Sequence, residues 1–468
     1  MATNIFAHFY TKTATSCSSL LLVGSVLISP STTNAISFLS TYTLSGDSSG
    51  DDFGTAVSGV ADLDGDNIPD LLIGAPGVVV GSGRRAQNFG MVRVISGSDG
   101  SVIRSIIGDN VNGNLGTSVS GLGDINNDGR ADFVAGAPGS SNELGSAHVY
   151  SGLDGSTLHD FDGSSPDRNF GSAVSGIGDV DGDQRPDIVV GTRLDSVFTN
   201  VGRVSVYSGA NGSELLGLSG GQFDGQFGTS VAGIADINND GRADLVVGEP
   251  GSNNLRGTVR AISGSDGGQI FQVDNVDLDD DFGFSISEAG DVNNDGVVDF
   301  VVGAPEIFSG SGYIAVISGA GFEGGTANPE ILNVSGATQN EAFGHSVSGL
   351  GDVNEDGYDD LLIGAPTASD NGTFSGKTIV ISGLDGSTLF SFVGDGANDQ
   401  FGSSVSAAGD LNGDGITDFI VGAPNGGEND GGYARVYLSQ VPEPSQFASI
   451  AGVLVLSMVW WLKRRPIG

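Results

Sequence analysis

The chain has 468 residues and a formal net charge of −39, and so acidic a balance excludes a protein that binds nucleic acid through a basic surface. It contains 79 glycines, which suit tight turns between many short strands. Because no sustained run of apolar residues at helical spacing is found, the composition predicts an all-β protein.

The first 35 residues are typical of an export signal. Lys12 precedes an apolar stretch at residues 20–28, and the small residues at 33–35 offer a cleavage point. The stretch is too short for a stable transmembrane helix. We predict a signal peptide over residues 1–35, with a disordered N-terminus as the alternative. Cys17, the single cysteine, lies within it, so the mature chain is expected to have no disulfide.

One short pattern then occurs seven times between residues 53 and 424. Each copy has Phe-Gly or Leu-Gly, an aspartate nine residues after the Phe or Leu, a second aspartate eight residues later, and a glycine four residues further that opens Gly-Ala-Pro or a variant. The copies begin at Phe53, Leu115, Phe170, Phe227, Phe282, Phe343 and Phe401. A period of 55 to 62 residues indicates a propeller, a solenoid or an array. A lone repeat cannot bury its apolar face, so residues 36–440 are predicted to form one closed unit.

The sixth copy shows what one repeat contains. Residues 343–351 alternate in polarity and predict a strand, 352–360 form an acidic loop, and 361–363 are a continuous apolar strand. Residues 376–382 and 388–393 supply two more strands around a glycine-containing hairpin turn. Four antiparallel strands of this kind make one propeller blade.

The seventh copy ends after its third strand, whereas residues 36–44, ahead of the first copy, alternate like the fourth strands elsewhere. We therefore predict that the N-terminal strand completes the last blade, since such closure removes free sheet edges. The expected fold is a seven-bladed β-propeller of four-stranded antiparallel blades.

The seven loops share the pattern D-x-[DN]-x-D-x-x-x-D, whose residues are numbered as loop positions 1 to 9. Side chains at positions 1, 3, 5 and 9 and the backbone carbonyl at position 7 would surround one point, and oxygen ligands of this number suit calcium. An EF-hand is excluded because it needs a glutamate at position 12, where every loop in this chain has an apolar residue. The predicted ligands are Asp62, Asp64, Asp66, Ile68, Asp70; Asp124, Asn126, Asp128, Arg130, Asp132; Asp179, Asp181, Asp183, Arg185, Asp187; Asp236, Asn238, Asp240, Arg242, Asp244; Asp291, Asn293, Asp295, Val297, Asp299; Asp352, Asn354, Asp356, Tyr358, Asp360; and Asp410, Asn412, Asp414, Ile416, Asp418.

The alternative to metal binding is a set of aspartate-rich turns that hold no ion. Scattered acidic residues would then be expected, whereas the seven sets are in register and contain 23 carboxylates that repel one another without a cation. The pattern favours up to seven structural Ca²⁺ ions and implies no open position for catalysis.

The C-terminal segment, residues 441–468, combines Pro442-Glu443-Pro444, an apolar run at 447–462 and three basic residues at 463–465. It resembles the PEP-CTERM sorting signal of Gram-negative bacteria. The resemblance implies processing by an exosortase, contact with the membrane through the tail before processing, and delivery to the cell surface or extracellular matrix. The alternative is a simple C-terminal membrane anchor, and both place the propeller outside the cell.

The Phe-Gly pair, the aspartate loop and Gly-Ala-Pro together resemble the FG-GAP repeats of the integrin alpha-subunit β-propeller. The resemblance implies that the calcium loops lie on one face of the disc and that partners dock on the other. The departures are Leu115 for phenylalanine, the triplets at 191–193 and 248–250 in place of Gly-Ala-Pro, and Asn67 and Gln184 where loops usually have glycine. Glutamine adopts a left-handed backbone less readily than asparagine, so the third loop has the least secure geometry. A signalling receptor is not expected.

Catalysis is not expected either, because His148, His159 and His345 are explained by strand surfaces, and pairs of acids arise by chance among 57 acidic residues. The first hypothesis is a calcium-stabilised surface module for adhesion that binds an unknown protein or polysaccharide ligand through the face opposite the loops. A purely structural component of an extracellular polysaccharide matrix is the second. The third is a secreted hydrolase with its site in longer loops such as residues 77–88.

Overall fold

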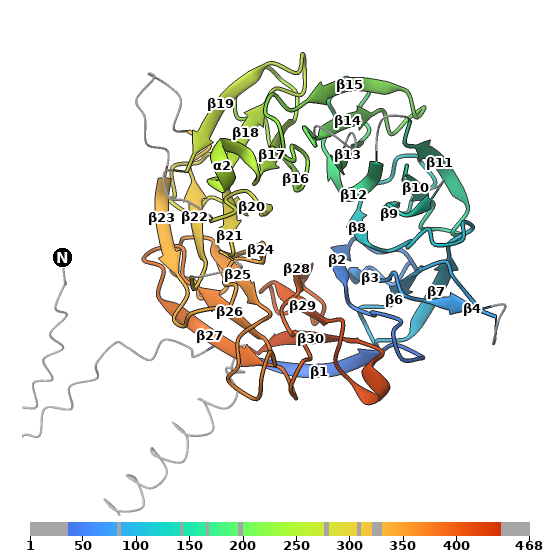
Figure 1. Ribbon diagram of the computed structural model, residues 1–468, viewed down its shortest axis with the longest axis vertical. Coiled ribbons are helices and arrows are strands. Elements are labelled where there is room, and N and C mark those ends of the chain that lie inside the picture. The colour runs from blue at the N-terminus through green and yellow to red at the C-terminus, as the bar shows by residue number, and fades with distance from the viewer. Residues whose placement is uncertain are drawn as a thin grey trace, which may run out of the picture. The chain divides into compact units, whose positions relative to one another are not determined.

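The computed structural model describes residues 36–440 except 82–85, 141–143, 165–167, 195–199, 276–279, 307–309 and 321–329. Seven four-stranded antiparallel sheets surround a central channel, which confirms the seven-bladed β-propeller (Figure 1). The predicted signal peptide and the predicted sorting tail lie outside the described residues. Within the described part of the chain, no helix is long and apolar enough to cross a membrane.

The blades follow one another along the chain, and the strands of each blade are named from the innermost to the outermost. Blade 1 contains β2 (Ala56–Val60), β3 (Asp70–Ala75), β6 (Met91–Ile95) and β7 (Val102–Ile107). Blade 2 contains β8 (Ser118–Gly121), β9 (Phe133–Ala137), β10 (Ser146–Tyr150) and β11 (Thr157–Asp162). Blade 3 contains β12 (Arg168–Ile177), β13 (Asp187–Leu194), β14 (Arg203–Tyr207) and β15 (Glu214–Ser219). Blade 4 contains β16 (Val231–Ile234), β17 (Asp244–Glu249), β18 (Thr258–Ile262) and β19 (Gln269–Asp274).

The remaining blades have the same order. Blade 5 contains β20 (Ser285–Gly290), β21 (Asp299–Ala304), β22 (Tyr313–Ile317) and β23 (Glu330–Ser335). Blade 6 contains β24 (Ser346–Gly351), β25 (Asp360–Ala365), β26 (Lys377–Ile381) and β27 (Thr388–Val393). Blade 7 contains β28 (Ser404–Gly409), β29 (Asp418–Ala423), β30 (Tyr433–Gln440) and the N-terminal β1 (Ser37–Ser45). Short extra elements are the hairpin β4 (Val79–Val80) with β5 (Gln87–Asn88), α2 (Ser252–Leu255) and the 3₁₀ turn η2 (Glu428–Asp430).

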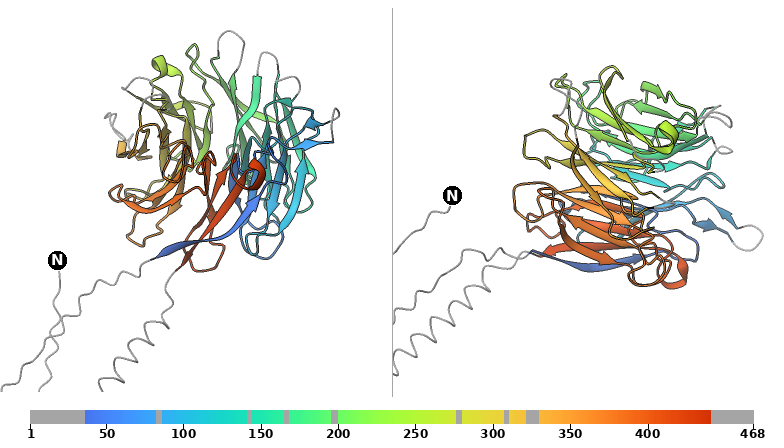
Figure 2. Two further views of the ribbon diagram at one scale, coloured as in Figure 1. Left: turned by 60° about the horizontal axis from the view of Figure 1, so that its bottom comes forward. Right: turned by 60° about the vertical axis from the view of Figure 1, so that its left-hand side comes forward.

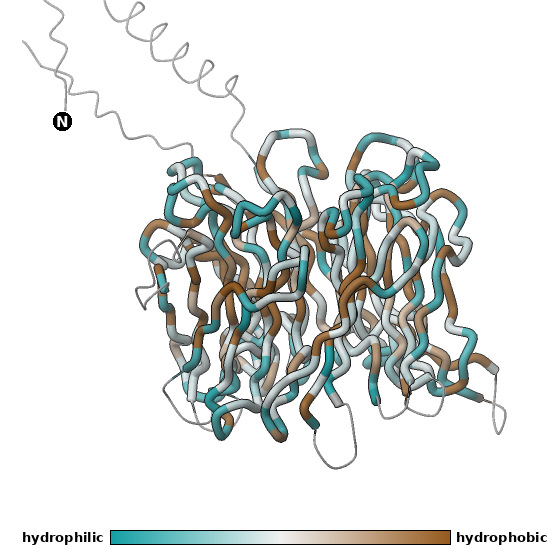
Figure 3. Tube along the Cα trace, turned by 90° about the horizontal axis from the view of Figure 1, so that it is seen from above, coloured by the Kyte–Doolittle hydropathy of each residue, from teal (hydrophilic) through white to brown (hydrophobic). Residues whose placement is uncertain are grey.

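Burial changes from the centre of a blade to its rim, and this follows from the sequence pattern. In blade 6 every residue of β25 and β26 is buried, because both faces of these strands pack against neighbouring blades. The outermost strand β27 alternates between exposed and half-buried residues. Figure 3 shows the hydropathy along the chain: hydrophobic residues are concentrated in the middle of the strands, and hydrophilic residues are concentrated in the loops at both ends.

The Phe-Gly pairs join each blade to the one before it. Each repeat's leading residue pairs in a parallel bridge with the glycine that precedes the third strand of the previous blade, as in Phe401 with Gly376. Leu115 makes the same bridge with Gly90 and is buried, so this departure from phenylalanine preserves the contact. The following glycines have positive φ, and a Cβ on Gly54 would lie 2.5 Å from the carbonyl oxygen of Tyr433.

The ring closes as predicted. β1 pairs antiparallel with β30, from Ser37 opposite Gln440 to Ser45 opposite Tyr433, and the two strands lie side by side in Figures 1 and 2. Phe38 is buried with its ring centroid 5.0 Å from that of Phe419 in blade 7 and 5.2 Å from that of Phe390 in blade 6. The N-terminal strand therefore holds the last blade in place.

A second set of contacts between blades surrounds the channel. Serine hydroxyls of five innermost strands each accept the backbone N–H of the next blade at 3.1 to 3.4 Å: Ser58, Ser120, Ser175, Ser348 and Ser406. Blade 4 has Ala232 at this position and lacks the hydroxyl. In blade 5, Ser287 donates its hydroxyl to the carbonyl of Glu288. Among the described residues, these hydroxyl contacts therefore join five of the seven pairs of neighbouring blades, all except blades 4 and 5 and blades 5 and 6.

Candidate metal loops

The seven acidic loops connect the first and second strands of their blades, and all lie on one face of the disc, which we call the loop face. The residue at position 6 has positive φ in every loop, including Asn67 at 67° and Gln184 at 70°, where the other five loops have glycine. The third loop thus has the same backbone course as the others. The departure at Gln184 does not disrupt it.

Backbone N–H groups hold the aspartates in the same way in each loop. The carboxylate at position 1 accepts the N–H of position 6 at 2.7 to 2.9 Å: Asp62, Asp124, Asp179, Asp236, Asp291, Asp352 and Asp410. The carboxylate at position 5 accepts the N–H of position 7 at 2.8 to 3.0 Å: Asp66, Asp128, Asp183, Asp240, Asp295, Asp356 and Asp414. These bonds fix the side chains locally but do not themselves neutralise the negative charges of the carboxylates.

The aspartate at position 9 has a different role, because it is fully buried in all seven loops. One oxygen accepts the N–H of position 2 at 2.7 to 3.0 Å. The other accepts an N–H from the residue two after the third strand, such as Gly97 in blade 1, or from Ser439 near the end of β30. This side chain therefore ties the acidic loop to the outer half of its own blade.

Burial raises the pKa of each of these buried carboxyls. The value is about 6 for Asp70, Asp132, Asp187, Asp244 and Asp418, and about 7 for Asp299 and Asp360. Nearby aspartates of the same loop raise it further, while the backbone N–H donors lower it. A cation bound in each loop would offset the free-energy cost of keeping that loop's carboxylate charge out of water.

Two loops bring three carboxylates together directly. Oxygens of Asp62, Asp64 and Asp70 lie within 4.8 Å of one another, as do those of Asp179, Asp181 and Asp187. The other five loops have asparagine at position 3. In loops 2, 4 and 6 its amide nitrogen lies 3.3 to 3.4 Å from the position 9 carboxylate, so an amide rotation would be needed to present oxygen there. The donor set of carboxylate and amide oxygens fits Ca²⁺.

All the predicted side-chain ligands therefore lie in seven equivalent loops, at comparable places. At position 7 the structure places Ile68, Arg130, Arg185, Arg242, Val297, Tyr358 and Ile416, each of which donates its backbone N–H to the position 5 aspartate. That their carbonyl oxygens bind the ion stays a prediction, as does the occupancy of each loop by calcium.

Two sets of side-chain contacts at these loops are not predicted by the sequence pattern. The arginines at position 7 reach the preceding loop: Arg130 lies 3.5 Å from Asp62, and Arg242 lies 3.8 Å from Asp179. Serines after the third strand donate to position 5 aspartates, as Ser151 does to Asp128 at 3.0 Å. Three consecutive loops with arginine at one position were the signal for the first set. The serines lie about 25 residues away in sequence, and only the fold brings them to the loops.

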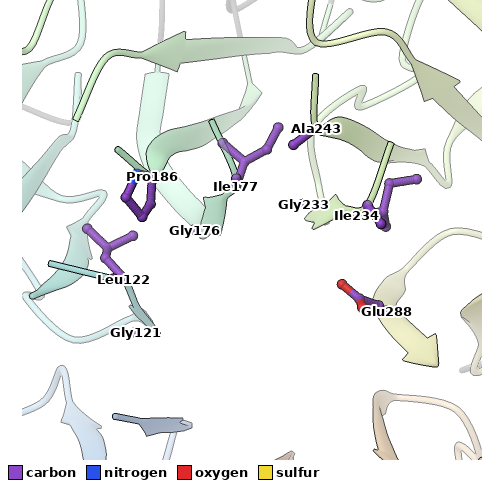
Figure 4. A pocket seen from close by; sticks show the side chains of 12 residues that line it. Gly121, Leu122, Gly176, Ile177, Pro186, Gly233, Ile234, Ala243 and Glu288 are labelled. Atoms are coloured by element: carbon purple, nitrogen blue, oxygen red, sulfur yellow. The ribbon is translucent and has the colours of Figure 1, made fainter. Parts of the chain in front are cut away.

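The central channel contains one charged group among the residues that line its described cavities, Glu288. Its carboxylate projects into a cavity of about 390 Å³ near the loop face, opposite an apolar wall that includes Ile177 and Ile234 (Figure 4). Other blades have glycine or alanine at this position. The protein wall around it reduces the solvation of the carboxylate and raises its pKa above the usual value.

The three histidines of the described residues, His148, His159 and His345, have structural surroundings. His148 Nδ1 lies 2.7 Å from Asp160 and its Nε2 lies 2.9 Å from the Ser146 hydroxyl, an arrangement with the groups of a serine hydrolase. Ser146 is fully buried and also contacts the buried Ser140, so a substrate cannot reach this hydroxyl. His159 contacts the carbonyl of Gly209, and burial lowers the pKa of His345.

The blades and their in-register acidic loops define a β-propeller built from repeats with candidate metal sites. Comparison with known families identifies the repeats. The FG-GAP repeat matches residues 53–95, 115–150, 227–271, 343–381 and 401–438, and an FG-GAP-like repeat matches 179–247. The chain is therefore an FG-GAP β-propeller.

Integrin alpha subunits are similar to this chain. Integrin alpha-V of Gallus gallus is 30% identical over 207 residues, integrin alpha-5 of Xenopus laevis 34% over 168, and integrin alpha-IIb of Homo sapiens 34% over 202. These matches cover 41%, 34% and 39% of this chain, and 20%, 15% and 19% of the respective integrins. The chain thus spans a fifth or less of the length of these relatives.

Proposed function

We propose that this protein is an exported, calcium-binding propeller that acts as an adhesion or interaction module at the cell surface or in the extracellular matrix of a Gram-negative bacterium. It binds a protein or polysaccharide ligand through the face opposite the loop face and performs no catalysis. The observation that carries the proposal is the division of the disc into two unlike faces. One face repeats the same nine-residue acidic loop seven times, and the other carries connections that differ from blade to blade.

The connections between second and third strands supply this variety. Blade 1 has the β4–β5 hairpin, blade 4 has α2, blade 6 has a longer loop at residues 366–376, and blade 7 has η2. Binding residues are found disproportionately on varied loops that a rigid scaffold holds in place. The opposite face therefore suits recognition, whereas the uniform loop face suits structural calcium.

The positions of the two ends of the propeller also favour a ligand site on the opposite face. Ser439 donates both its N–H and its hydroxyl to Asp418, so β30 ends at the loop face, and Ser37 pairs with Gln440 beside it. A C-terminal tail that enters a membrane, before exosortase processing or as a permanent anchor, would direct the loop face toward the membrane. The opposite face would then point outward, where ligands are available.

The proposal is tested with the mature protein coated on a surface in calcium. Binding of the producing cells and of their extracted matrix polymers is measured for the wild type, for Val79→Ala and Phe374→Ala on the opposite face, and for Glu355→Ala on the loop face. We expect substitutions on the opposite face to reduce binding and the substitution on the loop face to leave it unaltered. Loss of binding with the loop-face change alone would contradict the proposal, and absence of any binding would favour a purely structural matrix component.

A further inference from the structure

A pocket of about 410 Å³ lies over blade 6 on the face opposite the loops. It is formed by two connections that reach this face: residues 338–341, between β23 and β24, and residues 367–374, between β25 and β26. Its volume is at the lower end of the range of about 300–1,000 Å³ that is usual for small-molecule sites. The pocket can therefore hold one or two small rings.

The floor of the pocket is a rigid polar network. The Glu341 side chain is fully buried, and it accepts the N–H of Ala337 at 2.5 Å, the hydroxyl of Thr338 at 2.6 Å and the ammonium of Lys377 at 3.0 Å. Both oxygens of the Glu341 carboxylate therefore accept hydrogen bonds, and its negative charge compensates the positive charge of Lys377. A ligand would meet a surface that is already ordered and does not have to be rearranged.

One wall is the aromatic ring of Phe374, which is 42% exposed. Its backbone has φ of +54°, a conformation that bulky residues rarely adopt. The surrounding bonds hold it there: its N–H donates to the Ser369 hydroxyl at 3.1 Å, and its carbonyl accepts the N–H of Gln400 at 3.0 Å. Backbone strain of this kind persists where the surrounding structure enforces it, and it is often found at ligand sites.

The rim of the pocket offers exposed polar side chains. Gln339 and Asn340 are exposed, and their side-chain amides form no hydrogen bond with the described residues. The Asp370 carboxylate is 50% exposed and lies 3.7 Å from the Lys377 ammonium. Amide and carboxylate groups next to a flat apolar ring can pair with adjacent hydroxyls while the ring contacts C–H groups.

This combination matches the chemistry of a sugar ring, which has hydroxyls at its edge and C–H groups on its face. An apolar peptide side chain would leave the amides and the carboxylate of this rim unpaired, and an acidic polymer would be repelled by a protein of net charge −39. We propose that the pocket over blade 6 binds one or two units of a neutral polysaccharide, with Phe374 stacked on a sugar ring and Gln339, Asn340 and Asp370 bonded to its hydroxyls. The inference rests on the proposed function and supplies its ligand class.

The test is affinity gel electrophoresis of the full, calcium-loaded protein in native gels that contain dextran, soluble starch or galactomannan, with alginate as the acidic comparison. At least one neutral polymer should retard the wild type. Phe374→Ala should weaken that retardation at least about tenfold, whereas Phe374→Tyr, which keeps the ring, should preserve it. Asn340→Gly should also weaken binding, and since Asn340 has φ of +60°, glycine adopts its backbone without strain.

Phe223→Ala is the matched control. Phe223 is 67% exposed in the connection between β15 and β16, on the same face but outside the pocket, and its loss should leave retardation unchanged. The melting temperature of each variant checks folding. The pocket assignment is overturned if no neutral polymer retards the wild type, or if a folded Phe374→Ala variant is retarded equally. Binding of cells or of a protein ligand through this face would then still support the proposed function, whereas absence of all binding would end both.

Discussion

At the scale of single residues, blade 4 shows how a departure from the repeat is compensated. Glu249 stands where Gly-Ala-Pro has alanine, and its carboxylate is fully buried 2.6 Å from Arg260. Burial raises the pKa of Glu249 although the arginine lowers it. Arg260 also lies over the ring of Phe227, with its guanidinium carbon 5.4 Å from the ring centroid. Blades 1 and 7 have similar arginine–aromatic contacts, at 5.1 to 5.8 Å. The departure at residue 249 is visible in the sequence, but its partner Arg260 is not, because only the fold brings the two side chains together.

We expect Glu249→Ala to destabilise the protein by about 3–5 kcal/mol, because it leaves Arg260 largely buried without its carboxylate. The double variant Glu249→Ala/Arg260→Ala recreates the pair found in blade 5, Ala304 with Ala315, and should recover at least half of that loss. Free energies of unfolding from urea titration at constant calcium measure both. Additive losses in the double variant would show that the two residues do not compensate each other.

Glu288 predicts a pH effect. Its pKa in the folded state is above its unfolded value, so its stabilising contribution is complete at pH below about 4 and is lost as pH rises through the folded pKa. Glu288→Gln should therefore melt at a higher temperature than the wild type at pH 8, and the two should melt alike near pH 4. A variant that melts lower at pH 8 would indicate that the carboxylate has a stabilising partner.

At the scale of elements, the strand that closes the ring was predicted at residues 36–44 and is observed at Ser37–Ser45. Its alternation in polarity was sufficient for the prediction, because only an outermost strand was missing from blade 7. The acidic loops were equally predictable, because the spacing between their aspartates is the same in all seven copies. The pocket over blade 6 was not, because it depends on two connections of irregular length whose approach in space leaves no periodic signal.

The side chains of β1 provide a test of this closure. Phe38→Ala should cost about 3–4 kcal/mol, since it removes a buried ring from between blades 6 and 7. Leu39→Ala, a change at the adjacent residue that is 53% exposed, should alter stability by no more than about 0.5 kcal/mol. Chemical denaturation of the two variants compares them directly. Equal effects would mean that β1 contributes pairing to the blade but no packing.

At the scale of the whole molecule, negative charge is the main factor that opposes the folded state. The net charge of −39 and seven buried aspartates at loop position 9 disfavour the compact state unless cations compensate them. Fold class and blade number followed from the repeats, whereas the number of ions cannot be read from spacing alone. Asparagine at position 3 and the arginines at position 7 change the local charge from loop to loop.

We expect chelation to lower the melting temperature markedly. Where free calcium is about tenfold above a site's dissociation constant, each occupied site adds about 1.4 kcal/mol. Metal analysis of the dialysed protein should find several and at most seven ions, and added magnesium should not restore the loss fully, because it requires a smaller octahedral site. An unchanged melt together with no bound metal would contradict the metal-site interpretation.

The position of β30 has a mechanical consequence. This strand carries the chain out of the propeller at Gln440 and lies between β29 and β1, antiparallel to both. Tension between a ligand on the opposite face and an attached C-terminus would run lengthwise along β30. Its backbone bonds to both neighbours would then be loaded in shear, all at once, and would not open one after another. A tethered propeller of this construction should resist pulling far better in that direction than by its rim.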